Sequence, residues 1–325
     1  MKGAGLLASL ASIGLLAACG DGTGDTVATK AKTVCPAMPK QDYVWIPGAT
    51  FAMGADAHLP EEGPEKQATV AGFWMATHEV TNAEFAAFVK TTGYKTLAER
   101  DPPKLPGAPP DMLVPGGAVF TAPTDGNPNW WRWVVGAEWR HPAGPDTDID
   151  GRGREPVVQI AYEDALAYAR WAGKALPSEE QWELAAATGG ADRNVPVVDG
   201  KPQANYYQGV FPVRDMGTDG FTSRAPVACF PADKHGVHDL IGNVWEWTTA
   251  RAGGESNVIK GGSFLCAANY CARYRPAARQ FQERSLGTDH IGFRLIDTAR
   301  PAPRGASPRS ALRERSARRR ATARP

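Results

Sequence analysis

Short apolar runs separated by turn residues dominate the beginning of the chain and predict strands rather than long helices. Residues 41–54 carry two such runs on either side of Pro47 and Gly48, a pattern typical of two short strands joined at a turn. Residues 67–75 predict one further strand. We therefore expect this part of the chain to be β-structure.

A first helix is predicted between Thr81 and Gly93. Thr81 is followed three positions later by Glu84, the pairing of a capping box, and glycine is the residue that most often ends a helix. Phe85 and Phe88 fall on one face of this segment and would pack against the core.

Two more helices are predicted in the middle of the chain. One runs from about residue 162 to 171 and stops at Gly173. The other begins at Ser178, which forms a capping box with Gln181, and turns Trp182 inward.

The stretches 102–129 and 187–230 are rich in Gly, Pro, Asp and Asn and are predicted to be loops. The tryptophans at 130–133 suggest either a platform for a peptide or sugar, or core packing.

A chain with 35 Gly, 27 Pro and 10 Trp favours a loop-rich fold, and 325 residues at 42% hydrophobic suffice for a sizeable core. The Arg- and Pro-rich segment 298–325 predicts a disordered tail. A net charge of +1 gives no electrostatic reason to expect nucleic acid as a partner.

The N-terminus has the pattern of an export signal. Lys2 precedes a short apolar run that is too short to span a membrane and that ends in Leu-Ala-Ala-Cys at Cys19. This ending resembles a bacterial lipoprotein signal, with residues 1–19 as the signal and 20–40 as a polar tether. It predicts an exported protein anchored to a membrane through lipid on Cys19, at the periplasmic side or the cell surface. An ordinary cleaved signal is the alternative.

Two of the five cysteines, Cys266 and Cys271, lie five positions apart after a Gly-Gly-Ser turn. Such a pair fits a two-thiolate metal site, a redox pair or a structural disulfide, and export favours the disulfide. If these two act together, Cys35 and Cys229 are the candidates for a structural bridge, although four cysteines allow three connectivities.

Several side chains between residues 205 and 239 carry the oxygen atoms that calcium prefers. They show no EF-hand spacing, and ordinary turn residues have the same composition. These residues are Asn205, Asp215, Asp219 and Asp239.

Seven motifs in order make residues 41–297 similar to the formylglycine-generating enzymes, the sulfatase-modifying factor family. The resemblance implies an α+β domain of low regular secondary structure, related to the C-type lectins. The motifs are Pro-Gly-Ala-Thr-Phe-Ala-Met-Gly at 47–54, Glu-Val-Thr-Asn-Ala-Glu-Phe at 79–85, Trp-Arg-His-Pro at 139–142, Trp-Ala-Gly-Lys-Ala-Leu-Pro-Ser-Glu at 171–179, Gly-Asn-Val-Trp-Glu-Trp at 242–247, the double-cysteine segment, and Ile-Gly-Phe-Arg at 291–294.

The resemblance also implies an activity. The family uses molecular oxygen and Cu(I) to convert a cysteine within Cys-x-Pro-x-Arg of an unfolded sulfatase to Cα-formylglycine. The resemblance places the copper ligands at Cys266 and Cys271. This placement is chemically reasonable, since two thiolates suit Cu(I). Four further residues match positions that line the family's active site, namely Ser263, Tyr270, Trp245 and Arg279.

Two structural calcium sites are implied as well. The first would be formed by Asn205, the carbonyl of Tyr206, Asp219 and the carbonyl of Phe221. The second would be formed by Asp239, Gly242, Val244 and Glu246.

The chain departs from the family pattern at Ala267, where His is usual, and at His290, where Asn is usual. Two other functions are compatible with the same fold: a noncatalytic structural or binding lipoprotein, and a related oxidase with a different substrate. The presence of Ser263, Tyr270 and both cysteines of the segment favours the enzyme, because a scaffold needs none of them.

Overall fold

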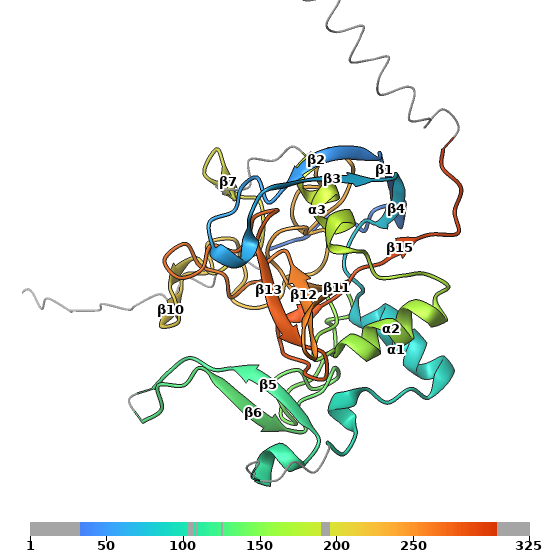
Figure 1. The fold of residues 1–325 in the computed structure, drawn as a ribbon. Coiled ribbons are helices and arrows are strands. Elements are labelled where there is room, and N and C mark those ends of the chain that lie inside the picture. The colour runs from blue at the N-terminus through green and yellow to red at the C-terminus, as the bar shows by residue number, and fades with distance from the viewer. Residues whose placement is uncertain (1–32, 103–106, 108–109, 125, 190–195, 304–325) are drawn as a thin grey trace, which may run out of the picture. The chain divides into compact units, whose positions relative to one another are not determined.

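The structure is a computed structural model that describes residues 33–102, 107, 110–124, 126–189 and 196–303 (Figure 1). The predicted signal, Cys19 as the predicted site of lipid attachment, and most of the predicted tail lie outside these residues. The α-helices of the described part are α1 (Asn82–Thr92), α2 (Tyr162–Trp171) and α3 (Glu179–Thr188). Its strands are β1 (Tyr43–Ile46), β2 (Ala49–Met53), β3 (Lys66–Val70), β4 (Phe73–Ala76), β5 (Gly116–Phe120), β6 (Trp131–Val135), β7 (Val197–Val198), β8 (Lys201–Pro202), β9 (Gly209–Val210), β10 (Arg214–Asp215), β11 (Trp245–Gly253), β12 (Ser256–Lys260), β13 (Arg279–Glu283), β14 (Ile291–Gly292) and β15 (Ile296–Asp297).

The strands form several small sheets instead of one large one. The largest has the order β13-β12-β11-β14, with β11 and β14 parallel and the other pairs antiparallel. A second sheet has the order β1-β4-β15, and β2-β3, β5-β6, β7-β8 and β9-β10 are two-stranded ribbons. Short 3-10 helices also occur, among them η1 (Pro60–Glu62). The predicted α+β class with low regular structure is confirmed.

Helix α1 begins and ends where the sequence predicts. The Thr81 hydroxyl accepts a hydrogen bond from the Glu84 backbone N–H at 3.3 Å, and the Glu84 carboxylate accepts one from the Thr81 N–H at 2.8 Å. Gly93 follows the last turn in the left-handed conformation, with φ of 67°. Phe85 and Phe88 are buried, which confirms the apolar face.

Helix α3 confirms the second capping box. The Ser178 hydroxyl accepts from the Gln181 N–H, and the Gln181 carbonyl oxygen accepts from the Ser178 N–H. Trp182 and Leu184 are fully buried and pack in a core cluster with strands β1 and β4. The helix therefore covers the core beneath the three-stranded sheet.

Three of the predictions about strands and loops are wrong. Residues 67–75 form the two strands β3 and β4 instead of one. The break falls at Gly72, where a Cβ atom would lie 2.3 Å from the Trp45 ring. Residues 102–129, predicted as a loop, contain β5, and residues 187–230 contain the short strands β7 to β10.

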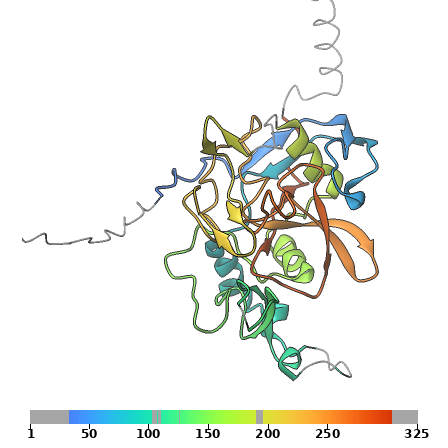
Figure 2. The same ribbon diagram turned by 90° about the vertical axis from the view of Figure 1, so that its left-hand side faces the viewer.

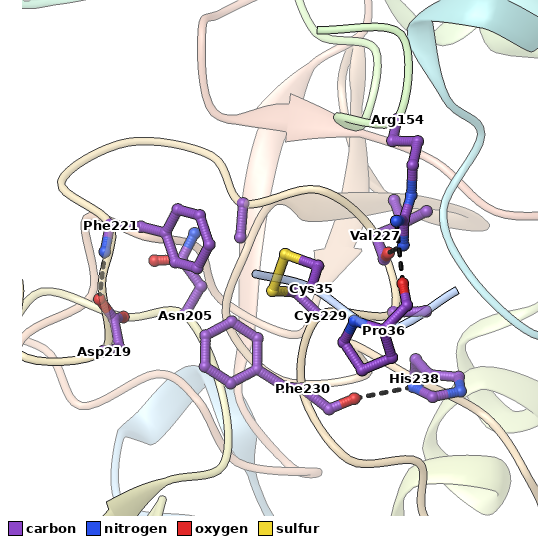
Figure 3. The surroundings of a disulfide bond; sticks show 12 residues. Cys35, Pro36, Arg154, Asn205, Asp219, Phe221, Val227, Cys229, Phe230 and His238 are labelled. Atoms are coloured by element: carbon purple, nitrogen blue, oxygen red, sulfur yellow. Dashed lines mark hydrogen bonds between the residues drawn. A yellow bond between two sulfur atoms is a disulfide. The ribbon is translucent and has the colours of Figure 1, made fainter. Parts of the chain in front are cut away.

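The disulfide joins Cys35 to Cys229, 194 positions apart (Figure 3). Beside it, the Arg154 guanidinium donates to the carbonyl oxygens of Pro36 at 2.9 Å and Val227 at 3.0 Å. This pairing confirms one of the three possible connectivities and attaches residue 35 to the folded domain. No helix among the described residues is long and apolar enough to cross a membrane.

Candidate active site

Two glycines at the end of β12 make room for the cysteine turn. Gly261 and Gly262 both have positive φ, 97° and 75°, which non-glycine residues adopt only with strain. A Cβ atom on Gly262 would lie 2.6 Å from the Arg273 carbonyl oxygen and 3.3 Å from the Cys266 sulfur. The Gly-Gly sequence is thus needed for the backbone to pass close behind Cys266.

The turn that follows brings the two sulfurs together. The carbonyl oxygen of Ala267 accepts hydrogen bonds from the backbone N–H groups of Tyr270, Cys271 and Ala272, so the chain folds back on itself. Cys266 and Cys271 are both free cysteines, and their thiols hydrogen-bond to each other. The structural disulfide, one of the three alternatives for this pair, is therefore not formed.

The two thiols titrate very differently. The hydrogen bond with Cys271 and burial raise the pKa of Cys266 well above its ordinary value. The hydrogen bond from Cys266 lowers the pKa of Cys271 to about 6. The Ser263 backbone N–H, 3.4 Å from the Cys266 sulfur, adds a further donor to the pair. At neutral pH the pair is thus a thiolate that accepts a hydrogen bond from a thiol.

The sulfurs face a cavity of about 630 Å³. Its walls come from the cysteine turn, the start of β11, the β5–β6 hairpin, the β9–β10 hairpin, β13 and η1. The side of the domain that carries the two hairpins faces the viewer in Figure 2. The lining residues are Leu59, Glu61, Trp130, Trp131, Phe211, Trp245, Ser263, Leu265, Cys266, Tyr270, Cys271, Arg273, Gln280, Phe281 and His290.

Five of the six residues predicted for catalysis line this cavity, and Arg279 does not. The lining five are Trp245, Ser263, Cys266, Tyr270 and Cys271. The Arg279 guanidinium instead forms an ion pair with Glu179, with Nε 3.0 Å from Oε1.

Two ion pairs tie the chain after the cysteines to η1. Arg273 bonds to Glu61 at 2.6 Å, and Arg275 bonds to Glu62 at 2.7 Å with both side chains buried. Glu61 therefore reaches the cavity wall although it lies 212 positions from Arg273. No local sequence signal identifies it as a site residue.

Aromatic rings form much of the wall. Phe211 stacks on Tyr270 with ring centroids 4.8 Å apart, and Trp130 meets Tyr270 edge-on at 5.8 Å. Trp131 packs against His290 at 4.8 Å. Of the two alternatives for the tryptophan cluster, the structure thus places Trp130 and Trp131 at a cavity instead of in the core.

His290 is buried and uncharged in this wall. Burial lowers the pKa of His290 to about 3. Its Nδ1 atom lies 2.7 Å from the Thr288 hydroxyl, which fixes the ring orientation. The imidazole thus offers the cavity a neutral polar group.

Comparison with known proteins identifies the family. The family model described as "Sulfatase-modifying factor enzyme 1-like domain" matches residues 28–299. The formylglycine-generating enzyme of Mycobacterium tuberculosis is 45% identical over 293 residues, which cover 78% of this chain and 97% of that protein. The chain belongs to the sulfatase-modifying factor family. The predicted resemblance is confirmed.

One further curated protein and one solved structure are also similar to this chain. The mouse protein named "Inactive C-alpha-formylglycine-generating enzyme 2" is 36% identical over 279 residues, covering 79% of this chain and 85% of that protein. The solved structure of PvdO from Pseudomonas aeruginosa matches with a TM-score of 0.55 and 24% identity, covering 78% of this chain and 93% of that one. The likeness to PvdO supports the fold alone.

The two departures from the family pattern lie in different places. Ala267 is fully buried, packs with Tyr207, Phe264 and Leu265, and is not itself a lining residue of the cavity. His290 is part of the lining. Of the two, only His290 therefore has its side chain at the cavity in this member of the sulfatase-modifying factor family.

The first predicted calcium group is partly assembled. The Tyr206 carbonyl and the Asp219 carboxylate both accept hydrogen bonds from the Gln208 amide nitrogen, at 2.6 Å for the carbonyl. Phe221 donates its N–H to Asp219 at 2.9 Å, and Asn205 lies nearby (Figure 3). Burial raises the pKa of Asp219. Oxygens that converge on one donor are suited to a cation in its place.

The second predicted calcium group surrounds a buried arginine. Glu246 accepts from Arg294 with both carboxylate oxygens, at 2.6 and 2.7 Å, and Asp239 accepts from the Ala228 N–H. Next to them, Glu79 is fully buried with one carboxylate oxygen unpartnered, and burial raises its pKa well above the usual range. Three buried acidic side chains, Glu79, Asp239 and Glu246, thus surround one arginine in this group.

Gly242 and Val244 of this second group are buried, and their backbone carbonyls would complete the ligand set. Within the described part of the chain, no three His, Cys, Asp or Glu side chains are arranged to hold a metal. Either calcium site would therefore depend largely on carbonyl and amide oxygens.

Proposed function

We propose that this protein oxidises a cysteine within a Cys-x-Pro-x-Arg segment of an unfolded sulfatase to Cα-formylglycine, with molecular oxygen and Cu(I). The observation that carries the proposal is the pair of unbridged cysteines facing an aromatic-walled cavity. Family membership and a relative named for this activity over most of both chains support it.

Cys266 and Cys271 fit the copper ion. Two sulfur donors that already hydrogen-bond to each other are close enough to share one soft cation, and the accessible Cys271 is the more readily deprotonated. When bound, Cu(I) would supply the one-electron chemistry with oxygen that amino-acid side chains lack.

The overall reaction balances with an external thiol as co-reductant. The substrate –CH₂SH group, O₂ and two thiols give an aldehyde, H₂S, H₂O and one disulfide. Oxygen accepts four electrons, two from the substrate cysteine and two from the external thiols. The substrate loses its C–S bond and gains a C=O bond.

The chain's own residues bind and orient the substrate. The Ser263 hydroxyl accepts a hydrogen bond from the Leu265 N–H, which leaves its own O–H to donate to a group in the cavity. The exposed Tyr270 ring and the buried Trp245 ring both line the cavity and would give the substrate apolar surfaces to pack against. Arg279 lies outside the lining, where it is paired with Glu179, and has no direct contact with the substrate in this proposal.

The test uses reduced protein, Cu(I) and a peptide containing Cys-x-Pro-x-Arg. We expect uptake of one copper per chain and conversion of the peptide to a hydrazide-reactive aldehyde, measured by mass spectrometry with oxygen consumption. The matched control peptide carries Ser in place of the reacting Cys. Copper uptake without an aldehyde would favour an oxidase with a different substrate. Failure to bind copper at all would favour a noncatalytic protein.

Two further features belong to the same proposal. Calcium at the two oxygen-rich groups would stabilise loops that have little helix or sheet. A lipid on Cys19 would hold the protein at a membrane in an exported compartment, and the Cys35–Cys229 disulfide is in keeping with export.

A further inference from the structure

Exposed apolar side chains gather on the β9–β10 hairpin beside the cavity. Val210 is 62% exposed, Val213 70% and Met216 50%. We call these three residues the hairpin surface. Large apolar side chains that cluster in solvent mark interaction sites more often than isolated ones do. The hairpin carries the β10 label in Figure 1 and projects from the domain.

The hairpin surface is continuous with the cavity. Phe211 lies between Val210 and Val213 in the sequence, lines the cavity and stacks on Tyr270 at 4.8 Å. Tyr270 in turn directly precedes Cys271. The same short hairpin therefore carries the Phe211 ring in the cavity wall and an outer apolar surface in solvent.

We propose that the hairpin surface binds the unfolded substrate polypeptide where it leaves the cavity. This inference rests on the proposed function. A cavity of about 630 Å³ has the size of a single small-ligand site, so it accommodates only a few residues around the reacting cysteine. The rest of the chain must cross the rim. An unfolded protein exposes apolar residues that a solvent-facing apolar rim can cover.

The charges near the hairpin surface favour a polypeptide over a membrane. Strands β9 and β10 carry one basic and one acidic residue, Arg214 and Asp215. Recognition of an anionic lipid surface depends on clusters of several Lys and Arg residues. Apolar contacts do not require a particular charge pattern in the bound chain. They therefore suit substrate segments in which the sequences on either side of the reacting cysteine vary.

The test compares a short and a long peptide with the same Cys-x-Pro-x-Arg core. The long peptide extends the core on both sides with apolar residues. In the variant Val210→Ser/Val213→Ser, kcat/KM for the long peptide should fall about fivefold, by loss of apolar contact area. Turnover of the short peptide should not change. The control variant is Val198→Ser/Val135→Ser, which removes two exposed valines, 52% and 48% exposed, that do not line the cavity. It should leave both peptides unaffected.

Binding of a fluorescent long peptide, measured without oxygen, separates this inference from the proposed function. If no peptide is turned over but the long peptide binds more weakly to the hairpin variant, the proposed activity fails and the docking surface stands. Equal losses for both peptides, or no loss for either, would overturn the inference. So would wild-type binding to anionic vesicles, or a wild-type dimer in sedimentation, that the hairpin variant abolishes.

Discussion

The two cysteine pairs of this domain have opposite chemistry in one fold. Cys35 and Cys229 are bonded across 194 positions and join the N-terminal segment to a distant loop. Cys266 and Cys271 lie five positions apart and remain thiols. The first pair closes a long loop, which restricts the unfolded chain strongly. A bond within the second pair would close only a short loop and would consume both sulfurs.

The residues around the two cysteine pairs also differ, in a way that matches the different states of the sulfurs. The disulfide lies among carbonyl groups fixed by Arg154 (Figure 3). The thiol pair lies at a cavity wall, where its own hydrogen bond makes one sulfur a good ligand at neutral pH. Sequence separation and local environment thus suit one pair to stabilising the fold, and they suit the other to the metal binding proposed above.

The largest expected effect comes from changing the thiol pair. Cys271→Ser should abolish stoichiometric Cu(I) uptake and reduce peptide oxidation at least about a hundredfold, because loss of groups that merely orient a metal ligand already costs 10–100-fold. Its melting temperature should stay close to that of the wild type. Copper titration and aldehyde formation measure the first two effects and calorimetry the third. A serine variant that binds copper and oxidises peptide normally would refute the assignment.

Changing the disulfide should produce the reverse result. Cys35→Ser/Cys229→Ser should lower the free energy of unfolding by about 2–5 kcal/mol. For a domain of this size that corresponds to a fall in melting temperature of about 5–15 °C. Copper uptake and kcat/KM, measured well below the melting temperature, should remain at wild-type values. Loss of copper binding in the folded variant would show that the two pairs are not independent.

The local features of the fold were predictable because their signals lie within a few residues. The capping boxes at Thr81 and Ser178 and the stop at Gly93 are short-range hydrogen-bond patterns. Strand β5 lies in the Gly- and Pro-rich stretch 102–129, whose composition predicts a loop, and it includes Gly117. The actual role of this glycine is close packing, since a Cβ atom there would lie 2.1 Å from the Gln159 side-chain oxygen.

The site was predictable only in part, for the same physical reason. The cysteine pair is local, and the family resemblance supplied Trp245 and Ser263. The wall formed by η1 depends on the Arg273–Glu61 ion pair, which spans most of the chain and has no local signal. Phe211 could have been suspected, because an apolar run inside a Gly- and Asp-rich stretch is unusual.

The smallest expected effect is a shift in thiol reactivity, and it tests the link between the two sulfurs. Because the hydrogen bond from Cys266 lowers the pKa of Cys271 to about 6, its thiolate forms as the pH rises through 6. The rate of alkylation of Cys271 in copper-free protein should therefore reach half its maximum near pH 6. For an ordinary cysteine the corresponding midpoint is about pH 8.5. A thiolate of low pKa is also a weaker nucleophile, so the plateau rate should be low. The disulfide cysteines should stay unlabelled throughout.

In Cys266→Ala the hydrogen bond is absent, and the midpoint of Cys271 alkylation should move to higher pH. Rates are followed by mass spectrometry of the labelled peptide from about pH 5 to about pH 9, a range that includes both expected midpoints. An unchanged midpoint in the variant would show that the low pKa of Cys271 does not depend on Cys266.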